Sequence, residues 1–118
     1  MTTFNQTVNK FYTLVQQYKF LDAVDKFYDQ NIISTDNAGE PIKGIEKLRQ
    51  SVKDFVANTD MNKIELISFI VSDNLSVAHW HYIFTHNKFG KLEYKQISVQ
   101  RWKDGKIIQE NHFYNLNF

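Results

Sequence analysis

Two side chains in the first third of the chain are of the types needed to move a proton on a small molecule. Asp36 closes a short run rich in β-branched residues, Ile32 to Thr35, which predicts a strand. Tyr12 lies in an earlier segment whose apolar residues recur every three or four positions, which predicts a helix. A carboxylate delivered by a strand into an apolar pocket can act as a base, and a nearby phenol can donate a hydrogen bond. Asp36 is therefore the first candidate for a base.

Both residues also have a plainer interpretation. Asp36 can form an Asx turn with Asn37 and Ala38, because aspartate readily hydrogen-bonds the backbone two residues on. Tyr12 lies on the apolar stripe of its helix, where an aromatic side chain usually packs into the core. The residue types alone leave these alternatives open.

The spacing of apolar residues predicts the elements that would position these side chains. Thr3 to Asp29 has a helical period with a change of phase near Phe20, which predicts two helices, the second capped by Asp22. Gly44 to Ala57 predicts a third helix. Four later runs predict strands: Lys63 to Ser72, Leu75 to Asn87, Lys91 to Trp102 and Lys106 to Leu116. We expect an α+β fold of one domain, residues 1–118, with N-terminal helices packed on a strongly curved antiparallel sheet.

The last two turns each end in a glycine, which predicts three-residue loops with Trp80 opposite Ser98 and Ser98 opposite Glu110. Residues opposite one another share a sheet face. The first face should carry Ala78, Trp80, Tyr82, Phe84, Tyr94, Gln96, Ser98, Ile108, Glu110, His112 and Tyr114. The second should carry His79, His81, Ile83, Ile97, Val99, Ile107, Asn111 and Phe113. We expect the first face to line a pocket, with walls at Trp80, Tyr82, Gln96, Glu110 and Tyr114.

The predicted last strand holds a further candidate pair. His112 and Glu110 are two residues apart and so lie on one face, where they form a proton-transfer pair, a pocket rim or a solvated strand surface. His79 and His81 also share a face, but two histidines on a strand supply only two metal ligands and no third is evident. We therefore expect neither a metal nor another cofactor.

Composition excludes several function classes. The chain has 118 residues, no cysteine and a net charge of +1, so disulfides, thiolate chemistry and electrostatic binding of nucleic acid or anionic membranes are not expected. No segment has the length of apolar sequence that spans a bilayer, and the N-terminus lacks the pattern of a signal peptide. We expect a cytoplasmic protein. Aromatic residues make up 15% of the chain, which fits either a densely packed core or the wall of a cavity.

The order of elements, with LDAVDKFYDQNIIST early, PIKGIEKLR in the middle and RWKDGKIIQ late, resembles the SnoaL-like group of the nuclear transport factor two-like superfamily. This group includes polyketide cyclases, and ketosteroid isomerases are more distant relatives. The resemblance covers almost the whole chain and implies a cone-shaped α+β barrel with a small-molecule pocket. It does not specify a reaction, because folds of this kind host catalysts and non-catalytic binders alike.

The resemblance also assigns roles to residues. The isomerase pattern places a tyrosine donor at Tyr12, the base at Asp36, and a protonated aspartic acid where this chain has Ser98, which is a weaker donor to an oxyanion. The cyclase pattern places an acid/base residue at His112, where an imidazole replaces the aspartate of the family. Ser98 can alternatively satisfy only a backbone neighbour.

Together these observations predict a pocket protein for a small apolar ligand. As an enzyme it would be a cofactor-independent isomerase or cyclase that moves protons on a small carbonyl compound, through Asp36, Tyr12, His112 and Ser98. The alternative is a non-catalytic ligand-binding or protein-interaction domain. The apolar second sheet face predicts a homodimer.

Overall fold

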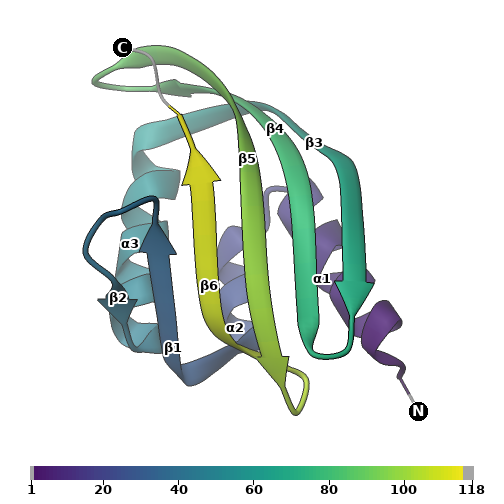
Figure 1. Ribbon diagram of the computed structural model, residues 1–118. Helices are drawn as coiled ribbons and strands as arrows, with labels where there is room; N and C mark the ends of the chain where they lie inside the picture. Colours follow the sequence, from purple (N-terminus) through teal and green to yellow (C-terminus); the bar gives the residue numbers. More distant parts are fainter. Residues whose placement is uncertain (1, 116–118) are drawn as a thin grey trace.

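The computed structural model describes residues 2–115 and shows three helices packed on one face of a curved six-stranded sheet (Figure 1). The strands lie in the order β2-β1-β6-β5-β4-β3. This arrangement confirms the predicted α+β fold. The elements are α1 (Phe4–Gln16), α2 (Phe20–Phe27), β1 (Tyr28–Asp36), β2 (Ile42–Lys43), α3 (Ile45–Asn58), β3 (Thr59–Ser72), β4 (Leu75–His86), β5 (Gly90–Lys103) and β6 (Lys106–Tyr114). The predicted end of the last strand, Leu116, lies outside the described residues.

The sheet is mixed, whereas the sequence predicted an antiparallel one. The pairs β3–β4, β4–β5 and β5–β6 are antiparallel, but β1 runs parallel to β6. This pairing sets Ser34 opposite Glu110 and Asp36 opposite His112. A contact between residues more than 70 positions apart leaves no local pattern, which is why the turns could not reveal it.

Local chemistry accounts for the starts of α1 and α3, but not for that of α2. Thr3 and Gln6 form a reciprocal capping box at the start of α1. The predicted cap of α2 is wrong: the N-cap is Lys19, without a side-chain hydrogen bond, and Asp22 lies inside the first turn, where its charge favours the helix dipole. Gly44 precedes α3 at φ 93°, which a side chain would strain. Within the described residues, no helix is both long enough and apolar enough to cross a membrane.

The turns differ from the prediction in detail. Asp104 and Gly105 both have positive φ and form a two-residue turn, and the extra residue of β6 is a bulge at Ile108. Ile107 therefore points into the core, fully buried, while Ile108 is exposed, so the predicted faces of these two residues are exchanged. Beyond the bulge the partners shift by two positions: Ser98 pairs with His112 rather than Glu110. Trp80 likewise pairs with Gln96 rather than Ser98, because the turn between β4 and β5 begins one residue earlier than predicted. Both shifts are even, so every other residue keeps its predicted face.

Most of the aromatic side chains fill the space between helices and sheet. Trp102, 3% exposed, makes edge-to-face contacts with Phe4, Phe11 and Phe27 from α1 and α2. Such contacts add to the stabilisation from apolar burial. The interior around Trp102 is thus filled by side chains.

Candidate functional site

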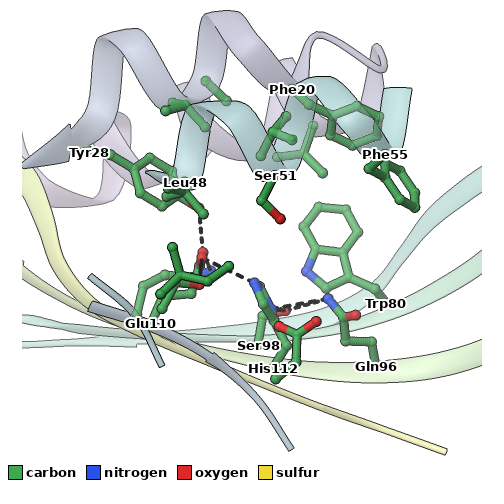
Figure 2. A pocket seen from close by; sticks show the side chains of 18 of the residues that line it. Phe20, Tyr28, Leu48, Ser51, Phe55, Trp80, Gln96, Ser98, Glu110 and His112 are labelled. Carbon is green, nitrogen blue, oxygen red and sulfur yellow. Dashed lines mark hydrogen bonds and ion pairs between the residues drawn. The ribbon is translucent and has the colours of Figure 1, made fainter. Parts of the chain in front are cut away.

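A cavity of about 230 Å³ lies between the helices and the sheet. Figure 2 shows its two sides: apolar side chains from the helices above and polar side chains from the sheet below. The helices contribute Phe11, Val15, Phe20, Ala23, Val24, Leu48, Ser51, Val52 and Phe55. The strands contribute Tyr28, Ser34, Asp36, Ile42, Trp80, Tyr82, Tyr94, Gln96, Ser98, Gln100, Glu110 and His112. A ligand would lie between an apolar roof and a polar floor.

The polar floor is built from two neighbouring rows of residues that face one another across the strands. The first row runs from β4 to β1 through Ser76, Gln100, Glu110 and Ser34. The second row runs through Ala78, Ser98, His112 and Asp36. Every member of both rows is on the helix-facing side because side chains alternate along a strand. The sheet therefore places an acid, an imidazole and a hydroxyl in direct contact.

Glu110 is the buried carboxylate of the site, with 2% of its surface exposed. It accepts hydrogen bonds from Tyr28, from Ser34 Oγ at 2.9 Å and from Gln100 Nε2 at 3.0 Å, and its Oε2 lies 3.1 Å from His112 Nε2. Burial alone would raise the pKa of Glu110, but the charge of His112 and the hydrogen bonds from His112, Gln100 and Tyr28 together lower it to about 2. Glu110 is therefore ionised in the folded protein.

His112 is the cationic partner of Glu110. Burial lowers the pKa of the imidazole, but the adjacent Glu110 carboxylate, with a smaller contribution from Asp36, outweighs it and raises the pKa above the ordinary 6.5. The side chain remains 22% exposed, on the cavity side. Its second ring nitrogen, Nδ1, lies 2.8 Å from Ser98 Oγ. As an imidazolium, His112 donates to Glu110 with one nitrogen and to Ser98 with the other.

Ser98 is consequently left with a hydrogen to give. Its Oγ accepts from Gln96 Nε2 at 2.9 Å as well as from His112 Nδ1. A hydroxyl oxygen accepts two hydrogen bonds and donates one, so the Ser98 hydrogen is available to a ligand in the cavity that Ser98 lines. This geometry gives the floor a neutral donor backed by a cation.

Asp36 differs from its expected environment. It lines the cavity opposite His112, but it is exposed to solvent, and its Oδ2 accepts a hydrogen bond from Tyr114 Oη at 2.8 Å. The carboxylate enclosed in the interior is Glu110, for which the sequence predicted a place in the pocket wall and, as one alternative, a proton-transfer pair with His112. Asp36 is thus an acid at the edge of the cavity, next to Tyr114, which contacts lining residues without lining the cavity itself.

Tyr12 lies outside the cavity. Its ring is 1% exposed and packs edge-on against Phe69 and Trp80, and its hydroxyl has no hydrogen-bond partner among the described residues. Burial raises the pKa of the Tyr12 hydroxyl, and the nearby Ser76 side chain lowers it to a smaller extent. The expected role of Tyr12 as a donor to a ligand does not fit this position, because the helix stripe places it in the core.

Comparison with known proteins identifies the family. The model of the SnoaL-like domain matches residues 8–110. The chain belongs to the SnoaL-like family. A search of curated proteins finds no sequence that matches it.

Solved structures share the SnoaL-like fold at low sequence identity. A protein from Mesorhizobium loti that is named a SnoaL-like polyketide cyclase has a TM-score of 0.87 and 20% identity, over 96% of this chain and all of that one. An NTF2-like protein of unknown function from Burkholderia pseudomallei has a TM-score of 0.81 and 16% identity, over 98% of this chain and 92% of that one. An LEH-like epoxide hydrolase from M. tuberculosis has a TM-score of 0.76 and 11% identity, over 93% of this chain and 80% of that one. At these identities the likeness shows the fold alone.

Three contributors to this SnoaL-like site were not anticipated: Tyr28, Ser34 and Gln100. All three donate to Glu110. Gln100 could have been found with the observed β5–β6 register, which places it opposite Glu110. Tyr28 and Ser34 depend on the parallel β1–β6 pairing, for which the sequence has no local signal.

The histidine pair His79 and His81 lies elsewhere in the SnoaL-like fold, on the sheet face away from the cavity. His81 is on the sheet face away from the helices, with Nε2 2.6 Å from Glu93 and Nδ1 3.7 Å from Glu65. Within residues 2–115, no group of three or more His, Cys, Asp or Glu side chains is arranged to hold a metal ion.

Proposed function

We propose that this SnoaL-like protein is a cofactor-independent acid–base enzyme of the isomerase or cyclase type, acting on a small uncharged carbonyl compound. The observation that carries the proposal is the His112–Glu110 ion pair, which faces an otherwise largely apolar cavity through Ser98. Buried groups with strongly shifted pKa values in a cavity are typical of catalytic sites. Proteins of this fold that are named a cyclase and an epoxide hydrolase are consistent with pocket chemistry.

Asp36 and Ser98 suit the two parts of a proton transfer: removal of the proton and stabilisation of the oxyanion that forms. Asp36 would take a proton from the carbon next to the carbonyl, so that the C–H electrons move toward the carbonyl oxygen. Ser98 would donate its hydrogen bond to that oxygen, with the His112 imidazolium behind it. Return of the proton from Asp36 to another carbon would complete an isomerisation.

The charges of the cavity define the substrate class. Asp36 and Glu110 are acidic, His112 is the single basic group, and no Lys or Arg side chain lines the cavity within the described residues. A carboxylate or phosphate on the ligand would find no cation other than one already paired with Glu110. The apolar roof favours a hydrocarbon body. We therefore propose an uncharged ketone or enone.

Proton exchange in D₂O tests this proposal before the natural substrate is known. A panel of small cyclic ketones, each paired with an analogue that carries a carboxylate, would be followed by ¹H NMR. We expect catalysed loss of the α-proton signal for some uncharged members and for none of the charged analogues. Binding of the same ketones without exchange would instead favour the non-catalytic ligand-binding alternative, and exchange in the charged analogues alone would contradict the proposed substrate class.

We also propose that a second copy of the chain covers the outer sheet face. Cross-strand neighbours on this face form two largely apolar rows, Ile70–Val77–Val99 and His79–Ile97–Phe113. Ile70 is 70% exposed, Phe113 48% and Ile97 37%. Exposed apolar residues that are contiguous across several strands mark an interface rather than ordinary surface. A symmetric pairing of this face with itself would cover it.

Sedimentation velocity tests the dimer. We expect the wild-type chain to sediment as a dimer at micromolar concentration and Ile97→Lys to sediment as a monomer, because the new charge would be buried in the interface. Val56→Lys is the matched control, since Val56 is 43% exposed but lies on α3, on the opposite side of the sheet. A wild-type monomer, or a dimer that survives Ile97→Lys, would contradict this interface.

A further inference from the structure

A series of buried, hydrogen-bonded polar side chains leads from the core to the His112–Glu110 ion pair. Trp102 Nε1 donates to Ser76 Oγ at 2.9 Å, Ser76 Oγ donates to Gln100 Oε1 at 3.3 Å, and Gln100 Nε2 donates to Glu110 Oε1 at 3.0 Å. All four residues are at most 3% exposed. Ser76 and Trp102 lie outside the cavity lining, so the proposed chemistry does not use them directly.

Trp102, the first residue of this series, fixes which group donates and which accepts in each hydrogen bond. An indole N–H donates and cannot accept, so Ser76 must use an oxygen lone pair on Trp102. The Ser76 hydrogen then finds its acceptor in Gln100 Oε1. With its oxygen engaged, the Gln100 amide must turn its N–H toward Glu110. That N–H needs an acceptor, which an ionised carboxylate provides.

The reversed amide would demand a different site. If the Gln100 oxygen faced Glu110, two acceptors would meet unless Glu110 carried a proton. The Ser76 hydrogen would then lose its acceptor, and a buried donor without a partner is costly. The observed orientation satisfies every member of the series at once.

We propose that Ser76 and Trp102 are positioning residues for the His112–Glu110 ion pair: they orient the Gln100 amide so that its N–H holds Glu110 in the ionised form. Glu110 in turn holds the charge of His112, with which Ser98 is in contact. This inference deepens the proposed function, on which its catalytic consequence rests, but the state of Glu110 can be measured without any substrate.

Few other ionisable groups surround Glu110. Tyr28 faces it from β1, His112 shares β6 with it, and Tyr82 on β4 acts at longer range. Asp36 lies in the next row and acts on His112. Among the described residues, the helices contribute no charged side chain to the cavity. Tyr28 and Tyr82 stay protonated because burial raises the pKa of both.

A carbon-detected NMR titration of the Glu110 side-chain carboxyl tests the proposal. In Ser76→Ala the amide loses its anchor, so we expect the Glu110 titration midpoint to move to higher pH by about one unit relative to wild type. Ser76→Thr keeps the hydroxyl and should return the midpoint toward the wild-type value. Ser68→Ala, which changes an exposed serine next to the bulge of β3, is the control and should leave it unchanged.

Trp102→Phe provides a second route if Ser76→Ala does not fold, because it removes the donor that fixes the donors and acceptors of the series. It should move the Glu110 midpoint the same way. A midpoint equal to that of wild type in a folded Ser76→Ala or Trp102→Phe protein would overturn the inference. Loss of ketone exchange is a separate readout, so the proposed enzyme could fail while the Glu110 shift is still observed.

Discussion

His112→Gln is expected to lower the rate of ketone proton exchange by at least about a hundredfold, the usual cost of removing one group that stabilises a developing oxyanion. Glutamine preserves a hydrogen-bond donor but cannot carry the positive charge that stands behind Ser98. The same variant should change the pH profile. The pKa of His112 is raised, so the imidazolium persists above pH 6.5 and is lost only as the pH rises further. Wild-type rate should therefore fall on the alkaline side, and the variant should lack this fall.

Asp36→Asn is the companion variant, because it removes the proposed base and keeps the shape of the side chain. We expect a loss of rate of at least about a hundredfold there as well. Full exchange activity in His112→Gln with a normal alkaline limb would contradict the assigned role of His112. Full activity in Asp36→Asn would show that another group takes the proton. Each rate is compared with that of Tyr12→Phe, which should be close to wild type because Tyr12 lies outside the cavity.

The fold followed from patterns that lie within a few residues of one another. Helical spacing located α1, α2 and α3, and the glycine turns located the antiparallel strands. The errors arose where a single residue decides the geometry. Asp104 adopts φ 51°, which shortened the expected turn, and the bulge at Ile108 took up the extra residue. These two departures left the functional face unchanged, because together they shift the register by an even number.

The candidate site was less predictable, for a physical reason. The sequence placed Ser98, Glu110 and His112 on one face, but their partners depend on which strands are neighbours and in which register. The parallel pairing of β1 with β6 brings Ser34 to Glu110 and Asp36 to His112. Nor can a sequence say which of two carboxylates is enclosed. Burial of Glu110 and exposure of Asp36 follow from the packing of Tyr28 and the end of β1 at the cavity edge.

Glu110 also makes the stability of the protein depend on pH. Its pKa falls from 4.5 in the unfolded chain to about 2 when folded, so its contribution is complete above pH 4.5 and is lost as the pH falls toward 2. This shift corresponds to about 3 kcal/mol of unfolding free energy. His112 has the opposite sign: its raised pKa stabilises the fold below pH 6.5, and that contribution is lost as the pH rises through the folded value. Stability should therefore be greatest between about pH 4.5 and 6.5.

Urea unfolding from pH 2.5 to 9 would measure this profile, and Glu110→Gln should flatten both of its sides. The amide cannot ionise, so the acidic side loses the Glu110 contribution. The substitution also leaves the His112 imidazole without a counterion. Protonation of His112 then no longer stabilises the fold, so the alkaline slope of the profile disappears as well. The variant should be less stable than wild type near pH 6. Glu40→Gln, an exposed loop change, should retain the wild-type profile. A Glu110→Gln profile with the same two slopes as wild type would mean that the ion pair at the cavity floor contributes nothing to the fold, and the electrostatic basis of the proposed site would then be lost with it.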